Sequence, residues 1–423
     1  MNIIVILSLI PVIIWIFMAP ISSRFGDFAT ISTSLGQIFG LVGMTLFSIN
    51  LILAGRFKFL DKYFNGLDKV YKNHSKIGSI AFSMILFHPI FLVIQYLSMS
   101  TKAAALFFVP FINMPITWGI ISLFLMIVLI SFTFYMKLKY HIWKMSHKFM
   151  VLAFAFGVIH TLTISSDISR NYLLRSYIFL LAFAGLVVSI RQAFLSKLLV
   201  KKLKYKVVGV NQLNTDVVEI EMEPIDEGMS FTPGQFAFFS FLSKGVTSEF
   251  HPFSISSSNK GTTLKITVKN LGDYTSLLKN LNKNDEVLVD GPYGHFSYQN
   301  VSSKNQIWIA GGIGITPFYS MAQNLDKGYN VNFYYSIKEE KEAVYTRELQ
   351  DISDRNPNFK FNIWNAKDKG YINGKVIGDL SGGVEGKDIF FCGPPIFMEN
   401  LKNQFTSLGV NSEKIHYENF SFN

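Results

Sequence analysis

The chain has 423 residues, of which 49% are hydrophobic, and its mean hydropathy is +0.30, which argues against a wholly soluble protein. Its single cysteine, Cys392, excludes an intramolecular disulfide and a cysteine-bound iron–sulfur cluster on this chain. The net charge of +10 does not indicate nucleic-acid binding, because lysines crowd the short connections between apolar segments. We therefore expect membrane lipid as a partner and no nucleic acid.

Six apolar segments in the first half predict membrane spans, at residues 3–19, 35–54, 77–98, 116–136, 148–165 and 172–194. The first segment lacks a basic leader and a convincing cleavage site, so we interpret it as a retained helix. The second and fourth connections are rich in lysine, and positive residues stay on the cytoplasmic side. We therefore expect six spans in the cell membrane, with both termini and the rest of the chain in the cytoplasm.

Four histidines lie in or beside two of these spans, His74 and His88 in the third and His147 and His160 in the fifth. The two histidines of each span are separated by about 20 Å of helix, so two sites can be stacked within a bilayer core of about 30 Å. The two spans run in the same direction, which pairs His74 with His147 and His88 with His160. We predict that each pair holds one b-type haem. A zinc or copper cluster is less favoured, because no carboxylate or cysteine accompanies the histidines.

The helical phase supports this pairing only in part. His74 and His88 share a helix face, whereas the 13 residues between His147 and His160 miss a whole number of turns by about 140°. The fifth helix is therefore expected to be irregular, or His147 to extend from an unwound end. Pro89 should distort the third helix, and His141 is assigned to a loop. The alternative interpretation is that the histidines are ordinary interfacial side chains.

The second half alternates strand-like segments with turns rich in glycine and hydroxyl groups. Strands are expected at 207–208 and 217–222, and turns follow at 251–258, 269–275 and 290–294. Such turns expose backbone N–H groups that suit a pyrophosphate.

Two further motifs are more specific. An apolar strand from Ile307 enters a glycine-rich turn and then a helix, so a phosphate can approach the backbone at the start of that helix. A second strand, at 389–391, ends at Cys392 and opens another helix. Because ligands of open α/β sheets bind at the carboxyl ends of the strands, we expect these two turns to form a nucleotide site.

Together these motifs resemble the ferredoxin-NADP reductase-type module: residues 251–254, 272–275, 311–317 and 392–395 and the terminal Glu418-Asn-Phe. Joined to helices with paired histidines, they resemble the NADPH oxidase and ferric reductase superfamily, of the bacterial NADPH oxidase type. The resemblance implies a membrane all-α six-helix bundle with a cytosolic FAD-binding antiparallel β-barrel and an α/β nucleotide-binding domain. The corresponding boundaries are 1–196 for the bis-haem domain, 197–300 for the FAD domain and 301–423 for the NAD(P)H domain.

The resemblance also implies residue roles. Phe253 should lie against the flavin, Ser254 near its reactive nitrogen, and His251 and Thr275 toward the pyrophosphate. The remaining residues expected around FAD are Pro252, Lys269, Gly272, Tyr274, Gly291 and Gly294. The nucleotide phosphates should meet Gly311, Gly312, Gly314, Thr316 and Pro317, and the nicotinamide should meet Cys392, Gly393 and Pro394.

Phe420 should cover the flavin until nicotinamide displaces it, with Phe422 as its rival. Ser254, Cys392 and Phe420 are thus the expected catalytic residues. Ser336, Lys338 and Arg347, with the hydroxyl of Tyr335, suit a 2′-phosphate and favour NADPH, with NADH as the alternative.

The expected activity is transfer of electrons from NADPH, through FAD and two haems, to an acceptor outside the cytoplasm. Oxygen, which one electron reduces to superoxide, is the first candidate acceptor, and a ferric chelate is the second. A third reading is an electron-supply subunit for a partner protein or a quinone, although no obligate protein partner is evident. Animal oxidases carry a histidine where this chain has Leu92, which weakens the oxygen assignment.

Overall fold

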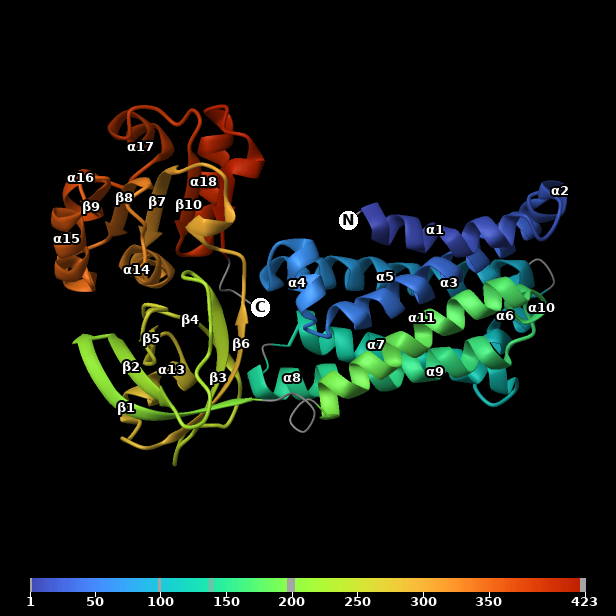
Figure 1. Cartoon of the computed structure of the whole chain (residues 1–423). Helices are drawn as coiled ribbons and strands as arrows, with labels where there is room; N and C mark the ends of the chain where they lie inside the picture. The colour runs from blue at the N-terminus through green and yellow to red at the C-terminus, as the bar shows by residue number, and fades with distance from the viewer. Residues whose placement is uncertain (1, 98–99, 137, 139, 196–201, 419–423) are drawn as a thin grey trace. The chain divides into compact units, whose positions relative to one another are not determined.

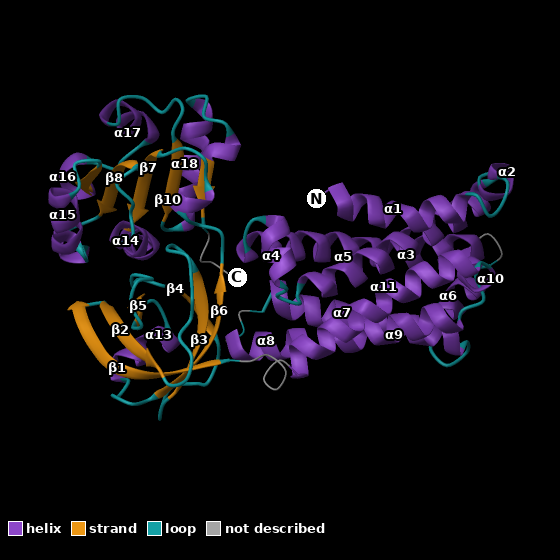
Figure 2. Cartoon of the chain, in the orientation of Figure 1, coloured by secondary structure: helices purple, strands orange, loops and turns teal. Residues whose placement is uncertain are grey.

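The computed structural model describes residues 2–97, 100–136, 138, 140–195 and 202–418. The chain divides into two compact units, which we describe separately. The first contains Met1–Leu60 with Lys69–Val200, and the second contains Asp61–Asp68 with Lys201–Asn423. The first unit is helical and the second is built on two sheets (Figure 2).

The helices of the first half of the chain are labelled in Figure 1. They are α1 (Asn2–Ile16), α2 (Ile21–Arg24), α3 (Phe28–Leu53), α4 (Lys58–Phe64), α5 (Leu67–Leu97), α6 (Thr101–Phe107), α7 (Met114–Phe134), α8 (Tyr140–Lys148), α9 (Met150–Thr163), α10 (Asp167–Arg170), α11 (Tyr172–Ile190) and the π-helix η1 (Arg191–Leu195). They form the first unit, except that most of α4 and the first residues of α5 belong to the second.

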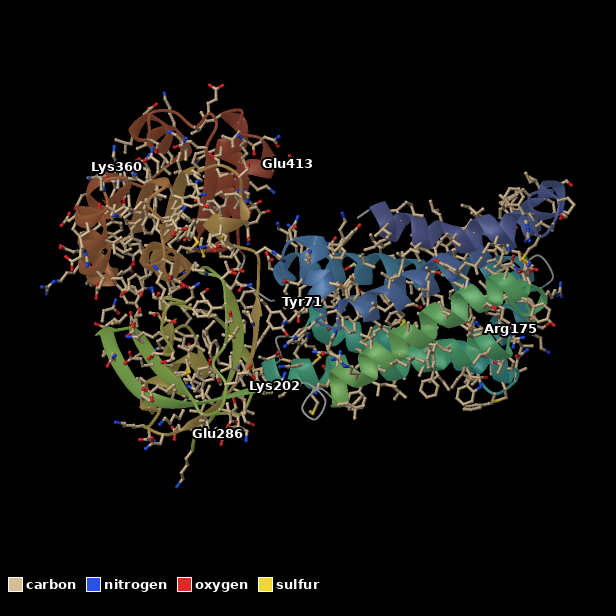
Figure 3. The ribbon with its side chains drawn as sticks, viewed as in Figure 1. Tyr71, Arg175, Lys202, Glu286, Lys360 and Glu413 are labelled. Carbon is tan, nitrogen blue, oxygen red and sulfur yellow. The ribbon has the colours of Figure 1, made fainter. Side chains whose placement is uncertain are left out.

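Five helical segments are long and apolar enough to cross a membrane: Phe28–Leu53, Leu67–Leu97, Met114–Phe134, Ile142–Thr163 and Tyr172–Leu195. Large apolar side chains such as Phe124, Leu180 and Phe183 are 65–73% exposed on the unit's surface, as lipid contact requires. Figure 3 shows side chains that point outward from the helices along this unit. The expected first span is shorter than predicted. Helix α1 has 15 residues and is about 22 Å long, less than the roughly 30 Å of a bilayer core.

Glycines on α3 allow this helix to lie close to α5. A methyl group added at Gly36 would meet the Leu92 side chain at 2.7 Å, and one at Gly40 would meet the His88 ring at 2.7 Å. Small residues at such positions let membrane helices approach until backbone and side chain touch. The backbone of α3 therefore reaches the ring of His88.

The fifth span is interrupted between its two histidines, as the phase argument predicted. Helix α8 ends at Lys148 and α9 begins at Met150, and the N–H of Phe149 donates to Ser146 rather than to the residue four before it. This tighter turn changes the phase between His147 and His160. The expectation of a loop at His141 was wrong, because this residue belongs to helix α8. Helix α5 continues across Pro89, so the distortion expected at this proline does not interrupt the helix.

The first sheet of the second unit is antiparallel, with strand order β4-β3-β6-β1-β2-β5. Its strands are β1 (Leu203–Asn214), β2 (Val217–Pro224), β3 (Phe236–Leu242), β4 (His251–Ser254), β5 (Leu264–Lys269) and β6 (Glu286–Tyr293). The edge strands meet at one antiparallel bridge, between Ile255 and Ile266. The short helices α13 (Asp273–Leu277) and η2 (Leu278–Asn280) follow β5, and η3 (Tyr298–Asn300) follows β6.

The glycine-rich turn expected at 290–294 was wrong, because residues 290–293 form the end of β6. An added methyl group at Gly291 would lie 2.7 Å from Ala237 Cβ, so this glycine is required by strand packing. Only Gly294, with φ of +93°, has the backbone conformation of a turn glycine.

The second sheet is parallel, with strand order β11-β10-β7-β8-β9. Its strands are β7 (Asn305–Gly311), β8 (Asn330–Ile337), β9 (Phe359–Asn365), β10 (Asp388–Cys392) and β11 (Ile415–Tyr417). Its helices are η4 (Gly312–Gly314), α14 (Ile315–Gln323), η5 (Glu340–Glu342), α15 (Thr346–Arg355), α16 (Ala366–Lys369), α17 (Gly374–Leu380), α18 (Pro395–Ser407) and η6 (Ser412–Lys414). The chain builds outward from β7 through β8 to β9 and then returns to the other side of β7. The crevice where the order reverses lies between β7 and β10.

A buried polar contact joins the two sheets. Tyr345, just before α15, donates its hydroxyl to Glu219 Oε2 of β2 at 2.7 Å and lies 2.5 Å from the Thr267 hydroxyl of β5. Its ring stacks on Tyr319 at a centroid distance of 3.9 Å. The Glu219 side chain is only 7% exposed, so this contact satisfies a buried carboxylate.

Tyr345→Phe should therefore leave an oxygen of Glu219 without its donor, which costs about 1–3 kcal/mol. We expect the melting temperature of the purified full chain, followed by flavin fluorescence, to fall by several degrees. Tyr371→Phe is the matched control, because Tyr371 is 79% exposed. An equal melting temperature for both variants would contradict this role of Tyr345.

Candidate functional site

The structure brings the four histidines together in the two pairs that were predicted. The ring centroids of His74 and His147 lie 6.2 Å apart, and those of His88 and His160 lie 6.3 Å apart. Each pair joins α5 to the α8–α9 segment. The fold thus brings α5 and the α8–α9 segment, which are far apart in the sequence, together at both histidine pairs.

Three of the four rings are oriented by the backbone of neighbouring helices. The Nδ1 of His74 lies 3.0 Å from the carbonyl oxygen of Asn50, that of His88 lies 2.7 Å from Gly36, and that of His160 lies 2.7 Å from Pro115. A carbonyl only accepts, so Nδ1 must donate and Nε2 keeps its lone pair. This is the tautomer that binds a metal through Nε2.

The ring spacing fits iron held between two imidazoles. A metal–nitrogen bond of about 2.0 Å and a nitrogen-to-centre distance of about 1.1 Å place two opposed ring centres about 6.2 Å apart. Both observed separations agree with this value. The residues present therefore fit a metal-containing group that would be held by one histidine from α5 and one from the α8–α9 segment.

His147 differs from the other three. Its Nδ1 is buried and has no hydrogen-bond partner among the residues that the structure describes. The indole of Trp143 stacks on its ring at a centroid distance of 5.5 Å, one turn earlier on α8. Packing against an aromatic ring, rather than a backbone carbonyl, thus orients this histidine.

In the antiparallel sheet, residues from two separate motifs meet. The ring of His251 on β4 stacks on Tyr274 of α13 at a centroid distance of 3.6 Å. Glu249 lies 3.6 Å from the same histidine ring. The predicted flavin-binding residues of the two motifs thus form one surface.

The other residues predicted for FAD lie around this contact. Phe253 is half-buried against the sheet's core, whereas the neighbouring Ser254 is 7% exposed. Pro252 precedes Phe253 on β4, and Lys269 is half-buried at the end of β5. Both β4 and β5 are edge strands of the antiparallel sheet, so the residues predicted for FAD lie at its two edges.

The loop before α13 is held by Thr275. Its Oγ1 accepts hydrogen bonds from the N–H groups of Leu271 and Gly272, at 2.9 and 3.0 Å. Nothing lies within 4 Å of a methyl group added at Gly272, so open space faces this backbone. The hydroxyl of Thr275 thus shapes the loop that was predicted to meet the pyrophosphate.

The two glycine motifs of the parallel sheet converge at the crevice between β7 and β10. An added methyl group at Gly314 would lie 2.3 Å from the Cys392 carbonyl oxygen, and one at Gly393 would lie 3.1 Å from Gly311 Cα. One at Gly311 would also meet Pro394 Cδ at 3.3 Å. These glycines therefore let the two turns touch where the strand order reverses.

One residue of this crevice is open to a ligand. Gly312 has φ of +56°, and nothing lies within 4 Å of a methyl group added to it. Thr316 and Pro317 are buried at the start of α14, and the Thr316 hydroxyl donates to the Ile313 carbonyl at 3.1 Å. Thr316 thus supports the turn, while the Gly312 backbone is free to approach a phosphate.

Glu418 is a residue of this site that the sequence reasoning did not single out beyond its motif. Its side chain is 2% exposed, and a methyl group added at Gly294 would lie 2.7 Å from its Oε1. Burial, followed by the charge of Glu418, raises the pKa of the Cys392 thiol. The Glu418 carboxylate thus lies beside Gly294 and acts electrostatically on Cys392, two residues that were predicted to border the flavin and the nicotinamide.

Three of the residues predicted for a 2′-phosphate are at least partly exposed. Ser336 lies half-buried near the end of β8, Lys338 follows that strand and is exposed, and Arg347 is exposed in the first turn of α15. Tyr335 was a wrong choice, because it is fully buried and its hydroxyl accepts from the Val344 N–H. Phe420 and Phe422 lie outside the described residues, so the flavin-covering role of Phe420 stays a prediction.

Three family models match consecutive parts of the chain. Residues 39–158 match "Ferric reductase like transmembrane component", residues 202–297 match "FAD-binding domain", and residues 308–403 match "Oxidoreductase NAD-binding domain".

Curated relatives match part of the chain. The glycine betaine monooxygenase reductase subunit of Pseudomonas aeruginosa is 30% identical over 207 residues, which is 45% of this chain and 56% of the relative. Flavohemoprotein B of Dictyostelium discoideum is 30% identical over 155 residues, 33% of this chain and 36% of the relative. The chain thus spans about half, or less, of the length of these relatives.

One solved structure is similar over most of the chain. The flavohemoglobin of Malassezia yamatoensis, with bound FAD and heme, covers 92% of this chain and 98% of its own, with a TM-score of 0.53 and 20% identity. This likeness concerns the fold alone. The three family models together show that the chain joins a ferric reductase like transmembrane component to an FAD-binding domain and an oxidoreductase NAD-binding domain.

Proposed function

We propose that this protein carries electrons across the membrane, from NADPH in the cytoplasm to an acceptor on the other side. The single observation that carries the proposal is the pair of histidine pairs, with ring centroids 6.2 and 6.3 Å apart, in a chain that also holds a flavin and nicotinamide module. Six spans, cytoplasmic termini, a closed FAD-binding barrel and the domain boundaries at 196/197 and 300/301 belong to the same proposal.

In the second unit, the residues bind and orient the two redox partners. The surface of His251 and Tyr274 with Ser254 would hold FAD, and the Gly312 turn would hold the nucleotide phosphates. Cys392 and Glu418 border the place where the nicotinamide would meet the flavin. When bound, FAD supplies the conversion of a two-electron hydride into single electrons. Ser336, Lys338 and Arg347 favour NADPH over NADH.

In the first unit, the histidines would hold two b-type haems, one between His74 and His147 and one between His88 and His160. Haem supplies one-electron transfer at depths where the bilayer admits no soluble carrier. The carbonyls of Asn50, Gly36 and Pro115 keep each Nε2 available. Two histidines on each iron leave no open coordination position, so an acceptor would take its electrons at the haem edge.

Oxygen, giving superoxide one electron at a time, is the first acceptor to be tested, and a ferric chelate is the second. Gly36 packs directly on Leu92, so an apolar side chain stands where animal oxidases carry a histidine. A polar cavity near this position, described below, favours the chelate as a second candidate. The comparison of both acceptors with the purified protein, with and without superoxide dismutase, separates them.

His88→Ala and His160→Ala should each remove one haem, because each iron would lose one of its two ligands. We expect haem content measured as the pyridine haemochrome to fall by about half relative to the unaltered protein, while flavin content stays constant. Ser79→Ala, an exposed position on the same helix α5, should change neither. Unaltered haem content in both histidine variants would contradict the assignment.

Phe420→Ser should let nicotinamide dwell on the flavin, because the ring that competes for the same face is removed. A stacked ring is worth about 0.5–1.5 kcal/mol beyond area burial, or roughly 2- to 13-fold in occupancy. The measurement is the charge-transfer absorbance of flavin and nicotinamide, with haem spectra unchanged. If removal of residues 421–423 produces this effect and Phe420→Ser does not, Phe422 is the covering ring.

A further inference from the structure

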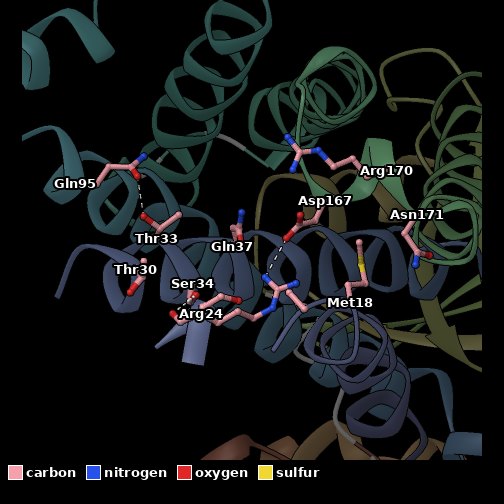
Figure 4. A pocket seen from close by; sticks show the side chains of 12 residues that line it. Met18, Arg24, Thr30, Thr33, Ser34, Gln37, Gln95, Asp167, Arg170 and Asn171 are labelled. Atoms are coloured by element: carbon pink, nitrogen blue, oxygen red, sulfur yellow. Dashed lines mark hydrogen bonds and ion pairs between the residues drawn. The ribbon is translucent and has the colours of Figure 1, made fainter. Parts of the chain in front are cut away.

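A polar cavity lies at one end of the helical unit, in the part of the bundle beyond His88 and His160. Its volume is about 630 Å³, and it is lined by the connection from α1 to α3, the first part of α3, the end of α5 and the helix α10 (Figure 4). The polar side chains used below are Arg24, Gln37, Gln95, Asp167 and Arg170. A cavity of this size accepts a ligand much larger than dioxygen.

The cavity is close to the second histidine pair. Gln95 lies seven residues beyond His88 on α5, about 10 Å along the helix. Gln37 directly follows Gly36, whose carbonyl accepts from the His88 ring. Asp167 follows His160 by seven residues, just past the end of α9. An occupant of the cavity would thus lie beside the pair from which we propose that electrons leave.

Arg24 is buried at the cavity with incomplete hydrogen bonding. Its side chain is 7% exposed; Nη1 donates to Asp167 Oδ2 at 3.1 Å and Nη2 to the Trp15 carbonyl at 2.8 Å. The guanidinium lies 3.7 Å from the centre of the Trp15 ring. Its Nε is buried and has no partner among the described residues. An unsatisfied buried donor costs about 1–3 kcal/mol, so a hydrogen bond from this Nε to an acceptor on a ligand would be favourable.

The charges of the cavity favour an anion. Asp167 is the one acidic lining residue, and it is already bound by Arg24 and by the Trp15 indole N–H at 2.9 Å. Arg170 is exposed at the rim and adds a second positive charge. Gln37, Gln95 and Thr33 add neutral polar groups, with the Thr33 hydroxyl donating to Gln95 at 2.8 Å. Arginine is the side chain best suited to carboxylate and phosphate groups.

We propose that this cavity binds the carboxylate groups of an anionic ferric chelate, and that Arg24 and Arg170 thereby select electron acceptors by their negative charge. The proposal rests on the proposed function, since it names the acceptor. Each chelated Fe(III) takes one electron and becomes Fe(II). One NADPH therefore reduces two chelates and releases NADP⁺ and one proton.

The test uses the full chain in nanodiscs of phosphatidylcholine, with NADPH as donor. Ferric citrate is the anionic probe, and hexaammineruthenium(III) is a cationic probe that needs no carboxylate site. Arg24→Gln and the exposed Arg170→Gln should each raise the KM for ferric citrate by about tenfold, the worth of one charge-assisted hydrogen bond. Neither should raise the KM for hexaammineruthenium(III). Lys102→Gln, which removes an exposed charge from α6 outside the cavity, is the matched control and should change neither KM.

Binding is tested separately with gallium(III) citrate, which accepts no electrons, by titration calorimetry. Wild-type binding that is weakened about tenfold in Arg170→Gln supports the cavity even if no electron transfer is detected, in which case the proposed function alone fails. No binding to the wild type, or equal effects of Arg170→Gln and Lys102→Gln, overturns the cavity proposal. Nanodiscs that contain phosphatidylglycerol distinguish a lipid headgroup: if this lipid abolishes citrate binding in the wild type, the cavity is a lipid site and the proposal is wrong.

Discussion

The paired arrangement of the histidines depends on hydrogen bonds between their rings and backbone carbonyls inside apolar helices. A helix carbonyl is normally used within its own helix, yet those of Asn50, Gly36 and Pro115 also accept from imidazole Nδ1 atoms. For Gly36 the glycines of α3 make this contact sterically available, because any side chain there would strike Leu92. The carbonyl fixes the tautomer, the tautomer leaves Nε2 free, and the pairing of the rings follows from where the helices meet.

The second unit contains an FAD-binding and an NAD-binding module, and its packing fixes the two sheets relative to each other. The glycine turns of β7 and β10 touch at the point where the strand order reverses, and Glu418 is buried beside both Gly294 and Cys392. Tyr345 ties the parallel sheet to Glu219 of the antiparallel sheet. A rigid arrangement of this kind limits the range of distances over which a hydride would have to move.

The sequence was sufficient for features that depend on local spacing. The 13-residue interval from His147 to His160 required an irregular helix, and the break at Phe149 is that irregularity. The glycine turns after two apolar strands were predicted to lie together, and the structure brings them together where the strand order reverses. Gly291 was misread, because a glycine required by strand packing has the same sequence appearance as one required by a turn.

Features assembled from distant segments could not be read from spacing. In the polar cavity, Arg24 is hydrogen-bonded to Asp167, which lies 143 residues away in the sequence, and no local pattern marks either residue. Tyr335 was misassigned because its polar hydroxyl does not reveal that the ring is in the core. Glu418 is buried near Gly294 and Cys392, which lie 98 residues apart in the sequence, so its position is revealed only by the fold.

The central claim is that electrons cross the bilayer through this one chain. The most direct measurement uses proteoliposomes with hexaammineruthenium(III) trapped in the lumen and NADPH added outside, so that only protein with its nucleotide site outward is active. The account predicts reduction of the trapped acceptor, accelerated by valinomycin and potassium because each electron moves charge across the membrane. If detergent-solubilised protein reduces the acceptor but the proteoliposomes, with the ionophore present, leave the trapped acceptor oxidised, the claim of transmembrane transfer is contradicted.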